Sequence, residues 1–193
     1  MLDNLKKYHI ILASNSPRRK ELLGGLGVDY EVKTIPGVDE SYPDTLQGEE
    51  IPMFISQKKA AAYLPAMSAG DLIITADTIV WLEGRVLGKP ADETDAKRML
   101  RELSGKTHQV ITGVTLSTAA FQKSFAVTSE VEFAPLDEDE IDYYVKNYRP
   151  LDKAGAYGVQ EWIGFIGVRN LAGSYFNVMG LPIQRLYQEL KQL

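Results

Sequence analysis

A junction between an apolar segment and a helix start constrains the fold of this chain most strongly. Residues 10–13 are apolar, the next three are small and polar, and Pro17 opens a run that reads Arg-Arg-Lys-Glu-Leu-Leu. Ser16 is a good N-cap, and a proline suits the first helical position because its missing N–H is not needed there. The pattern therefore predicts a buried strand over 8–13 followed directly by a helix over 17–26.

Three cations, Arg18, Arg19 and Lys20, occupy the first turn of that expected helix. Cations at a helix N-terminus oppose the helix dipole, so charge complementarity does not explain them. A bound anion would remove the conflict, because free backbone N–H groups and the guanidinium groups would all point at it. The alternative is that the three side chains extend into solvent. Their position between a buried strand and an N-cap favours the anion site.

The rest of the chain alternates between strand and helix patterns. Further strands are expected over 30–35, 71–82, 109–116 and 125–133, and further helices over 49–67, 92–103, 137–148 and 182–190. A hairpin turn is expected at 83–85, whereas 150–182 is Gly-rich and irregular. This mixture predicts an α/β fold with a mixed twisted sheet and flanking helices. A single domain over 1–193, built as two lobes that share a cleft, fits the length.

The charge balance excludes some classes of protein. The 193 residues carry a net charge of −5, which argues against a protein that coats nucleic acid, since phosphate contacts need a basic surface. A small basic pocket for one nucleotide remains compatible with that charge. The chain has no cysteine, and it has neither a signal-peptide core nor an apolar run of membrane-spanning length. We therefore expect a cytoplasmic protein that binds neither nucleic acid nor membrane.

Two carboxylates are candidates for chemistry. Asp77 is the lone carboxylate inside the strongly apolar segment 75–80. A buried charge is costly unless it is paired with a cation, hydrogen-bonded or bound to a metal. An aspartate satisfied by local backbone at a strand end or bulge is an equally good interpretation. Glu40, in an expected loop, is either a second oxygen ligand for Mg²⁺ or Mn²⁺ or a solvated acid.

Other polar residues have weaker signals. Lys89 stands between a glycine and a proline, which places it on a tight, preformed turn. Lys59 has the pattern of an exposed helical lysine. Gln160 and Asn177 lie in Gly-rich stretches where the backbone can approach a ligand closely. No phosphate-binding loop, dinucleotide fingerprint, zinc site or nucleophile elbow is present.

Six motifs in one order, spread from about Ile10 to Leu190, resemble those of the Maf nucleotide pyrophosphatases. They are Ala-Ser-Asn-Ser-Pro-Arg-Arg over 13–19, Ala-Asp-Thr over 76–78, Gly-Lys-Pro over 88–90, Ile-Thr-Gly over 111–113, Asp-Lys-Ala-Gly-Ala-Tyr-Gly over 152–158 and Gly-Ser-Tyr-Phe-Asn-Val-Met-Gly-Leu-Pro over 173–182. The resemblance implies two lobes around a central cleft, similar to the inosine triphosphate pyrophosphatases. It also implies a homodimer that hydrolyses nucleoside triphosphates to the monophosphate and pyrophosphate with the help of a divalent metal.

The resemblance also implies roles for single residues. Water that attacks the α-phosphorus needs a base, a divalent cation and positive charge around the phosphates. Asp77 matches the base, and Glu40 together with Asp77 matches the ligands of Mg²⁺ or Mn²⁺. The residues that match the triphosphate cradle are Ser14, Arg18, Arg19, Lys59 and Lys89.

The substrate branch can be argued from the same motifs. Ala-Asp-Thr over 76–78 resembles the dTTP/UTP branch, whereas the methyl-GTP branch has Ser-Asp-Gln. In the dTTP/UTP branch, the residues that match Arg18, Thr78 and Gln160 set specificity. A glutamine amide offers a donor and an acceptor that complement N3–H and O4 of uracil or thymine.

Some alternatives stay open at this stage. The pair Glu161-Trp162 stands where a small glycine is common in the family, and a bulky pair there could reshape the base pocket. A methyl-GTP-type pyrophosphatase and a non-catalytic nucleotide-binding regulator of cell division are the other readings. A nucleic-acid-binding protein that uses the basic run 18–20 conflicts with the acidic net charge.

Overall fold

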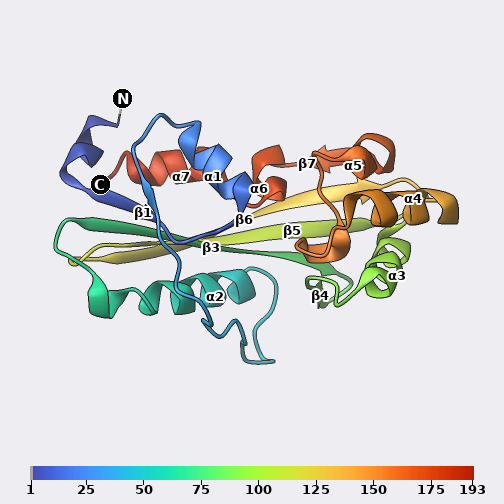
Figure 1. Cartoon of the computed structure of the whole chain (residues 1–193), viewed down its shortest axis with the longest axis horizontal. Helices are drawn as coiled ribbons and strands as arrows, with labels where there is room; N and C mark the ends of the chain where they lie inside the picture. The colour runs from blue at the N-terminus through green and yellow to red at the C-terminus, as the bar shows by residue number, and fades with distance from the viewer. Residues whose placement is uncertain (1) are drawn as a thin grey trace. The chain divides into compact units, whose positions relative to one another are not determined.

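The computed structural model describes residues 2–193 and has a seven-stranded mixed sheet at its centre (Figure 1). The strands are β1 (His9–Leu12), β2 (Glu31–Val32), β3 (Asp71–Leu82), β4 (Arg85–Leu87), β5 (Thr107–Ser117), β6 (Gln122–Phe133) and β7 (Val168–Ala172). Their order is β2-β1-β3-β5-β6-β7, and β4 pairs with β3. Strand β1 runs parallel to β2 and β3, whereas β4 and β7 run antiparallel to their partners. The predicted mixed α/β fold is thus confirmed.

The helices flank this sheet. The α-helices are α1 (Pro17–Gly24), α2 (Glu50–Ala61), α3 (Glu93–Leu103), α4 (Glu138–Tyr148), α5 (Trp162–Gly167), α6 (Tyr175–Met179) and α7 (Ile183–Leu190). Three short 3₁₀ helices are η1 (Asp3–Lys7), η2 (Leu64–Ala66) and η3 (Ala154–Ala156). None of the helices in the described part of the chain has the length and apolar character needed to cross a membrane.

Three of the sequence predictions differ most from the structure. The helix expected over 49–67 ends at Ala61 and continues as η2, because Pro65 lacks a donor and disfavours α geometry in the residue before it. The strand expected over 30–35 is only two residues long. The stretch 150–182 is not irregular throughout: it contains α5, β7 and α6. Strand β7 forms because it pairs with β6, with Val131 opposite Leu171.

The chain divides into two compact units. The first comprises the described residues up to Asp77 together with Thr112–Val127 and Gly180–Leu193, and the second comprises Thr78–Ile111 and Thr128–Met179. Met1, which belongs to the expected domain 1–193, lies outside the described residues. Strands β3, β5 and β6 contribute residues to both units.

In the first unit, α1 and α7 cover one face of the strands and α2 covers the opposite face (Figure 1). The core between them is apolar, with Leu12, Leu23 and Ile74 fully buried. Gly113 of β5 lets α2 lie directly on the sheet, because a Cβ atom there would come within 2.3 Å of the Pro52 carbonyl carbon. This contact explains why a glycine follows the strand residues Ile-Thr at 111–112.

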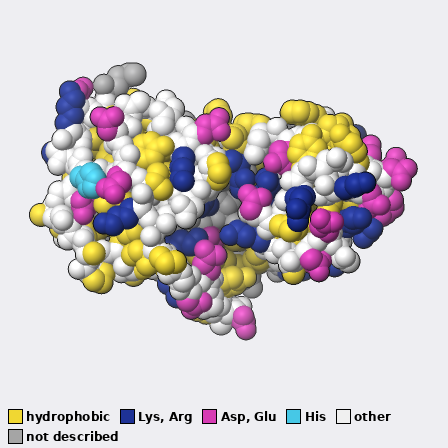
Figure 2. All heavy atoms as spheres, in the orientation of Figure 1, with side chains coloured by type: hydrophobic (Ala, Val, Ile, Leu, Met, Phe, Trp, Pro, Cys, Tyr) yellow, Lys and Arg dark blue, Asp and Glu magenta, His cyan; other side chains and the backbone are white. Residues whose placement is uncertain are grey.

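In the second unit, α3 and α4 pack together. Both helices start within one residue of the positions expected, 92 and 137. Asp92 caps α3, and Asp137 with Glu140 forms a capping box on α4. Lys, Arg, Asp and Glu side chains are interspersed over their outer surface (Figure 2). The core is aromatic, and His108 and Tyr157 contact each other edge to face with ring centroids 5.4 Å apart.

Candidate active site

The turn between β1 and α1 has the predicted start of a helix. The Ser16 hydroxyl accepts a hydrogen bond from the Arg19 backbone N–H at 3.5 Å, and Ser14 Oγ accepts one from the Ser16 N–H at 3.3 Å. Ser14 is buried, and Arg18 and Arg19 are partly buried. The residues that the sequence placed around an anion therefore gather at this turn of the first unit.

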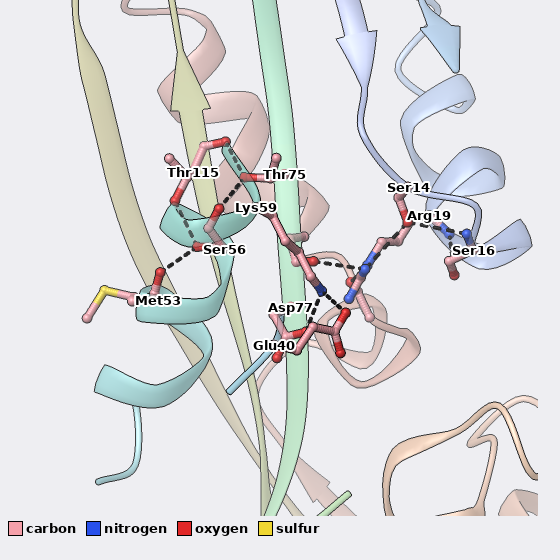
Figure 3. A network of polar contacts seen from close by, with 12 residues as sticks. Ser14, Ser16, Arg19, Glu40, Met53, Ser56, Lys59, Thr75, Asp77 and Thr115 are labelled. Carbon is pink, nitrogen blue, oxygen red and sulfur yellow. Dashed lines mark hydrogen bonds and ion pairs between the residues drawn. The ribbon is translucent and has the colours of Figure 1, made fainter. Parts of the chain in front are cut away.

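Arg19 does not extend into solvent. Its Nε donates to the Gly180 carbonyl at 2.8 Å, and its Nη1 donates to the Ala76 carbonyl at 3.0 Å (Figure 3). Burial lowers the pKa of the Arg19 guanidinium, and the negative charge of Asp77 opposes that shift. Since Ala76 precedes Asp77 on β3, Arg19 ties the start of α1 to the backbone beside that carboxylate.

Lys59 joins the two candidate carboxylates. Its Nζ lies 2.7 Å from Asp77 Oδ1 and 2.9 Å from Glu40 Oε1 (Figure 3). The side chains of Lys59 and Asp77 are 16% and 13% exposed, whereas that of Glu40 is 51% exposed. The interpretation of Lys59 as an exposed helical lysine was wrong. Asp77 lies within β3 and is paired with a cation, so its charge is compensated by a partner distant in sequence.

A buried network of hydroxyl groups sets the position of Lys59 relative to Asp77. The Thr75 hydroxyl donates to the Ser56 carbonyl at 2.7 Å, and Ser56 Oγ lies 2.8 Å from Thr115 Oγ1 (Figure 3). Ser56 lies one helical turn before Lys59, and Thr75 lies two residues before Asp77 on the same face of β3. These bonds therefore hold α2 in register with β3.

Sequence reasoning missed this network. Its signal is the presence of Thr75 and Thr115, buried hydroxyl residues inside otherwise apolar strands. Buried polar groups need partners, so such residues point to a specific contact. The partner of each hydroxyl could not be named before the packing of α2 was known.

The carboxylates of Glu40 and Asp77 fit a hard divalent cation. Asp77 comes from β3 and Glu40 from the loop before α2, and both already share one positive charge, that of Lys59. Mg²⁺ is commonly held by one or two carboxylates together with substrate phosphate oxygens. Over residues 2–193, no group of three or more His, Asp or Glu side chains is placed to hold a metal. Glu40 and Asp77 would thus supply two oxygen ligands to such an ion.

The remaining candidates belong to the second unit. Thr78 follows Asp77 on β3 and is partly buried. Lys89 is exposed directly after β4, next to Gly88, whose carbonyl accepts a hydrogen bond from the Gly155 N–H at 3.0 Å. Gly155 has a positive φ of 67°, and a Cβ atom there would come within 2.9 Å of a Val80 methyl carbon. The Gly-Lys-Pro segment and the segment 152–158 are therefore held together.

Gln160 has a buried side-chain oxygen, Oε1, with no hydrogen-bond partner among residues 2–193. An unsatisfied buried acceptor is unusual and needs an explanation, of which a ligand donor is one. Its neighbour Glu161 is engaged elsewhere: Lys153 Nζ lies 3.1 Å from Glu161 Oε1, and the Tyr144 hydroxyl donates to Glu161 Oε2. The Gly158 N–H donates to the same tyrosine oxygen at 3.0 Å. These contacts hold the loop that carries Gln160.

Two further residues have structural contacts. Trp162 packs on Tyr143 of α4, with ring centroids 4.7 Å apart. Asn177 is fully buried, and its Nδ2 donates to the Val110 carbonyl at 3.1 Å and to Ser129 Oγ at 3.0 Å. Asn177, which the sequence grouped with Gln160, is therefore part of the core of the second unit.

Comparisons with known proteins agree with the motif series. The family model described as "Maf-like protein" matches residues 9–193. Proteins named dTTP/UTP pyrophosphatase from Phocaeicola vulgatus and Bacteroides fragilis are 68% and 69% identical over 193 residues, which is 100% of both chains in each case. A solved structure of a HAM1 protein from Coxiella burnetii is 18% identical, with a TM-score of 0.47, and covers 96% of this chain and 100% of that chain. That last likeness is too weak to carry an argument, so the expected similarity to inosine triphosphate pyrophosphatases stays a prediction.

Proposed function

Because this chain belongs to the Maf-like family, we propose that it is a nucleoside triphosphate pyrophosphatase that hydrolyses dTTP and UTP. The products are the nucleoside monophosphate and pyrophosphate. The name of the relatives at 68% and 69% identity supports the substrates. The observation that carries the proposal is the Glu40–Lys59–Asp77 cluster, in which two carboxylates and a cation converge beside the α1 turn.

In the proposed reaction, water attacks the α-phosphorus and the bond to the bridging oxygen of the pyrophosphate breaks. Asp77, which lies within β3, orients the water and accepts its proton. A Mg²⁺ or Mn²⁺ ion, when held by Glu40 and Asp77, supplies positive charge to the phosphate oxygens and acidifies water. Lys59 can donate to the same phosphates from α2.

The cationic side chains and the base-reading residues complete the proposal. Arg18 and Lys89 neutralise phosphate charge, while Arg19 and Ser14 shape the turn that receives it. Gln160 accepts the N3–H of uracil or thymine at its buried oxygen, which has no partner among the described residues. Arg18 and Thr78 contribute to the same preference, as the family resemblance implies.

The decisive experiment follows the fate of UTP in ¹⁸O-labelled water. Purified protein with Mg²⁺ or Mn²⁺ should yield UMP and pyrophosphate, separated by ion-exchange chromatography, with the label in UMP. A label in pyrophosphate would mean attack at the β-phosphorus, and UDP with orthophosphate would mean a different reaction class. Omitting the metal tests its requirement. Competition between UTP and 7-methyl-GTP in one tube tests the substrate branch.

The proposal also includes a cytoplasmic homodimer. Exposed apolar side chains on the second unit support self-association, with Phe165 76% and Phe176 46% exposed on α5 and α6. Hydrophobic side chains gather over the part of this unit that holds α5 (Figure 2). Such a patch marks an interaction site in many soluble proteins. Sedimentation of the wild type and of Phe165→Asp, which should shift toward the monomer, tests this part.

A further inference from the structure

The Lys59 ammonium group lies between two carboxylates, in the position that a metal ion would take. Its ammonium nitrogen is within hydrogen-bond distance of one oxygen from Asp77 on β3 and one from Glu40 in the loop before α2. Both oxygens are also the natural ligands for a divalent cation at this place. The side chain of this chain's own lysine therefore neutralises the carboxylate pair from within the protein.

A divalent cation and the Lys59 ammonium cannot both occupy this position. Two positive charges that share the same pair of oxygens repel each other strongly in a partly buried site. Lys59 can leave without moving its helix, because its charge is carried on a flexible four-carbon stem. The helix itself stays fixed, since Ser56 of α2 is bonded to Thr75 and Thr115.

We infer that Lys59 is an internal counter-ion that competes with the divalent metal for Glu40 and Asp77 and moves to the triphosphate when the nucleotide binds. The metal and the nucleotide then bind cooperatively. The metal displaces Lys59 from the carboxylates and frees it for the triphosphate, and the triphosphate draws Lys59 away from the oxygens that the metal needs. Such coupling is reciprocal, so the nucleotide must strengthen metal binding by the same factor as the metal strengthens nucleotide binding. This inference rests on the proposed metal-dependent function.

The test measures Mn²⁺ binding directly, by the loss of the free Mn²⁺ signal in electron paramagnetic resonance. Without nucleotide, Lys59→Met should bind Mn²⁺ more tightly than the wild type, by on the order of tenfold. With α,β-methylene-UTP, which is not hydrolysed at the α-phosphorus, this advantage should shrink toward onefold. Chelation of Mn²⁺ by the nucleotide affects both proteins equally and cancels in the comparison.

Lys58→Met is the matched control. Lys58 is the adjacent residue on α2, and its ammonium contacts Asp39 Oδ2 and the Ser41 carbonyl instead of the candidate ligands. Its removal deletes the same charge and should not tighten Mn²⁺ binding. The double variant Lys59→Met with Glu40→Gln should lose the gain. If Lys59→Met fails to fold by circular dichroism, Lys59→Gln removes the charge and keeps a polar contact.

The inference is overturned if the Lys59 variant binds Mn²⁺ no more tightly than the wild type. It is equally overturned if Lys58→Met shows the same gain, because the effect would then be general charge loss. UTP hydrolysis by the wild type is measured separately. If the wild type hydrolyses UTP but Lys59→Met binds Mn²⁺ no more tightly, only the competition between Lys59 and the metal is refuted. If Lys59→Met binds Mn²⁺ more tightly but the wild type does not hydrolyse UTP, the competition is supported and the proposed function is refuted.

Discussion

Each unit of this protein holds a lysine between two carboxylates, and the two clusters differ in what else surrounds them. In the first unit, Lys59 lies 2.7 Å from Asp77 and 2.9 Å from Glu40. In the second unit, Lys153 lies 2.8 Å from Asp152 and 3.1 Å from Glu161. The pattern of charges is the same in both.

The second cluster is also held by hydrogen bonds from neutral donors. Glu161 also accepts from the Tyr144 hydroxyl, and that hydroxyl accepts from the Gly158 N–H. Burial and the contact with Glu161 raise the pKa of Tyr144 well above its usual range, so it stays a donor. In the first cluster, ion pairs hold Lys59 to Asp77 and Glu40. A metal can replace the ammonium group at the carboxylates, and phosphate oxygens can replace the carboxylates at Lys59. The cluster around Lys59 therefore suits exchange with ligands, whereas the cluster around Lys153 suits holding a loop.

The largest expected effect separates the two clusters by activity. Asp77→Asn keeps the shape of the side chain but removes its basicity and most of its affinity for metal, so turnover of UTP should fall by about a hundred- to ten-thousandfold. Glu161→Gln should leave the maximal rate within about threefold, because an amide can still accept from Tyr144. Steady-state kinetics with circular dichroism as a check of folding measures both. More than a tenth of wild-type turnover in Asp77→Asn would contradict the assignment of the base.

The contribution of each lysine to the free energy of unfolding can be compared by thermal and chemical unfolding. Lys59→Met and Lys153→Met each leave one partly buried carboxylate, Asp77 or Glu161, without its cation, and each should lower the free energy of unfolding by about 2 kcal/mol. Millimolar Mn²⁺ should restore the Lys59 variant, because a ligand that binds the folded state stabilises it. It should not restore the Lys153 variant, in which Tyr144 still occupies one oxygen of Glu161. Equal restoration of both would remove the distinction between the clusters.

The pH dependence of stability tests the core of the second unit. His108 is 2% exposed, and burial lowers its pKa to about 4 from 6.5. Below pH 6.5 the unfolded chain takes up a proton that the folded protein refuses, so stability falls as the pH drops from 6.5 toward 4. Between pH 7 and pH 5 the loss should be about 2 kcal/mol. Urea unfolding at both pH values measures it, and His108→Gln should flatten the slope.

The smallest effect concerns base preference. Gln160→Ala should lower the ratio of kcat/KM for UTP over GTP by about tenfold, because the site then loses its hydrogen bond to the base edge. Glu161→Ala should also lower this ratio, because the loop that carries Gln160 loses its contacts with Lys153 and Tyr144. Glu161→Gln should keep the preference for UTP. Trp162→Gly should change the ratio little, since that ring packs on Tyr143. If Trp162→Gly admits GTP while Gln160→Ala does not, the pocket is narrowed by the tryptophan instead.

Local signals predicted most of the fold. The strand expected over 71–82 matches β3 at both ends, and the helix that Ser16 and Pro17 indicate starts where those residues place it. Strand alternation and helix caps act over a few neighbouring residues, so they can be read from the chain alone. The short elements in 150–182 could not be found in this way, because β7 exists only through its pairing with β6.

The residue types, the motif series and most of the elements that carry them can be read from the chain alone. The partners of the charged residues come from packing: Lys59 pairs with Asp77, Arg19 binds the carbonyls of Ala76 and Gly180, and Glu161 contacts Lys153 and Tyr144. These partners lie far apart along the chain. A cap acts within one turn, whereas an ion pair between α2 and β3 forms only after the helix has docked on the sheet. That docking depends on Gly113 and on the hydrogen bonds of Ser56, Thr75 and Thr115.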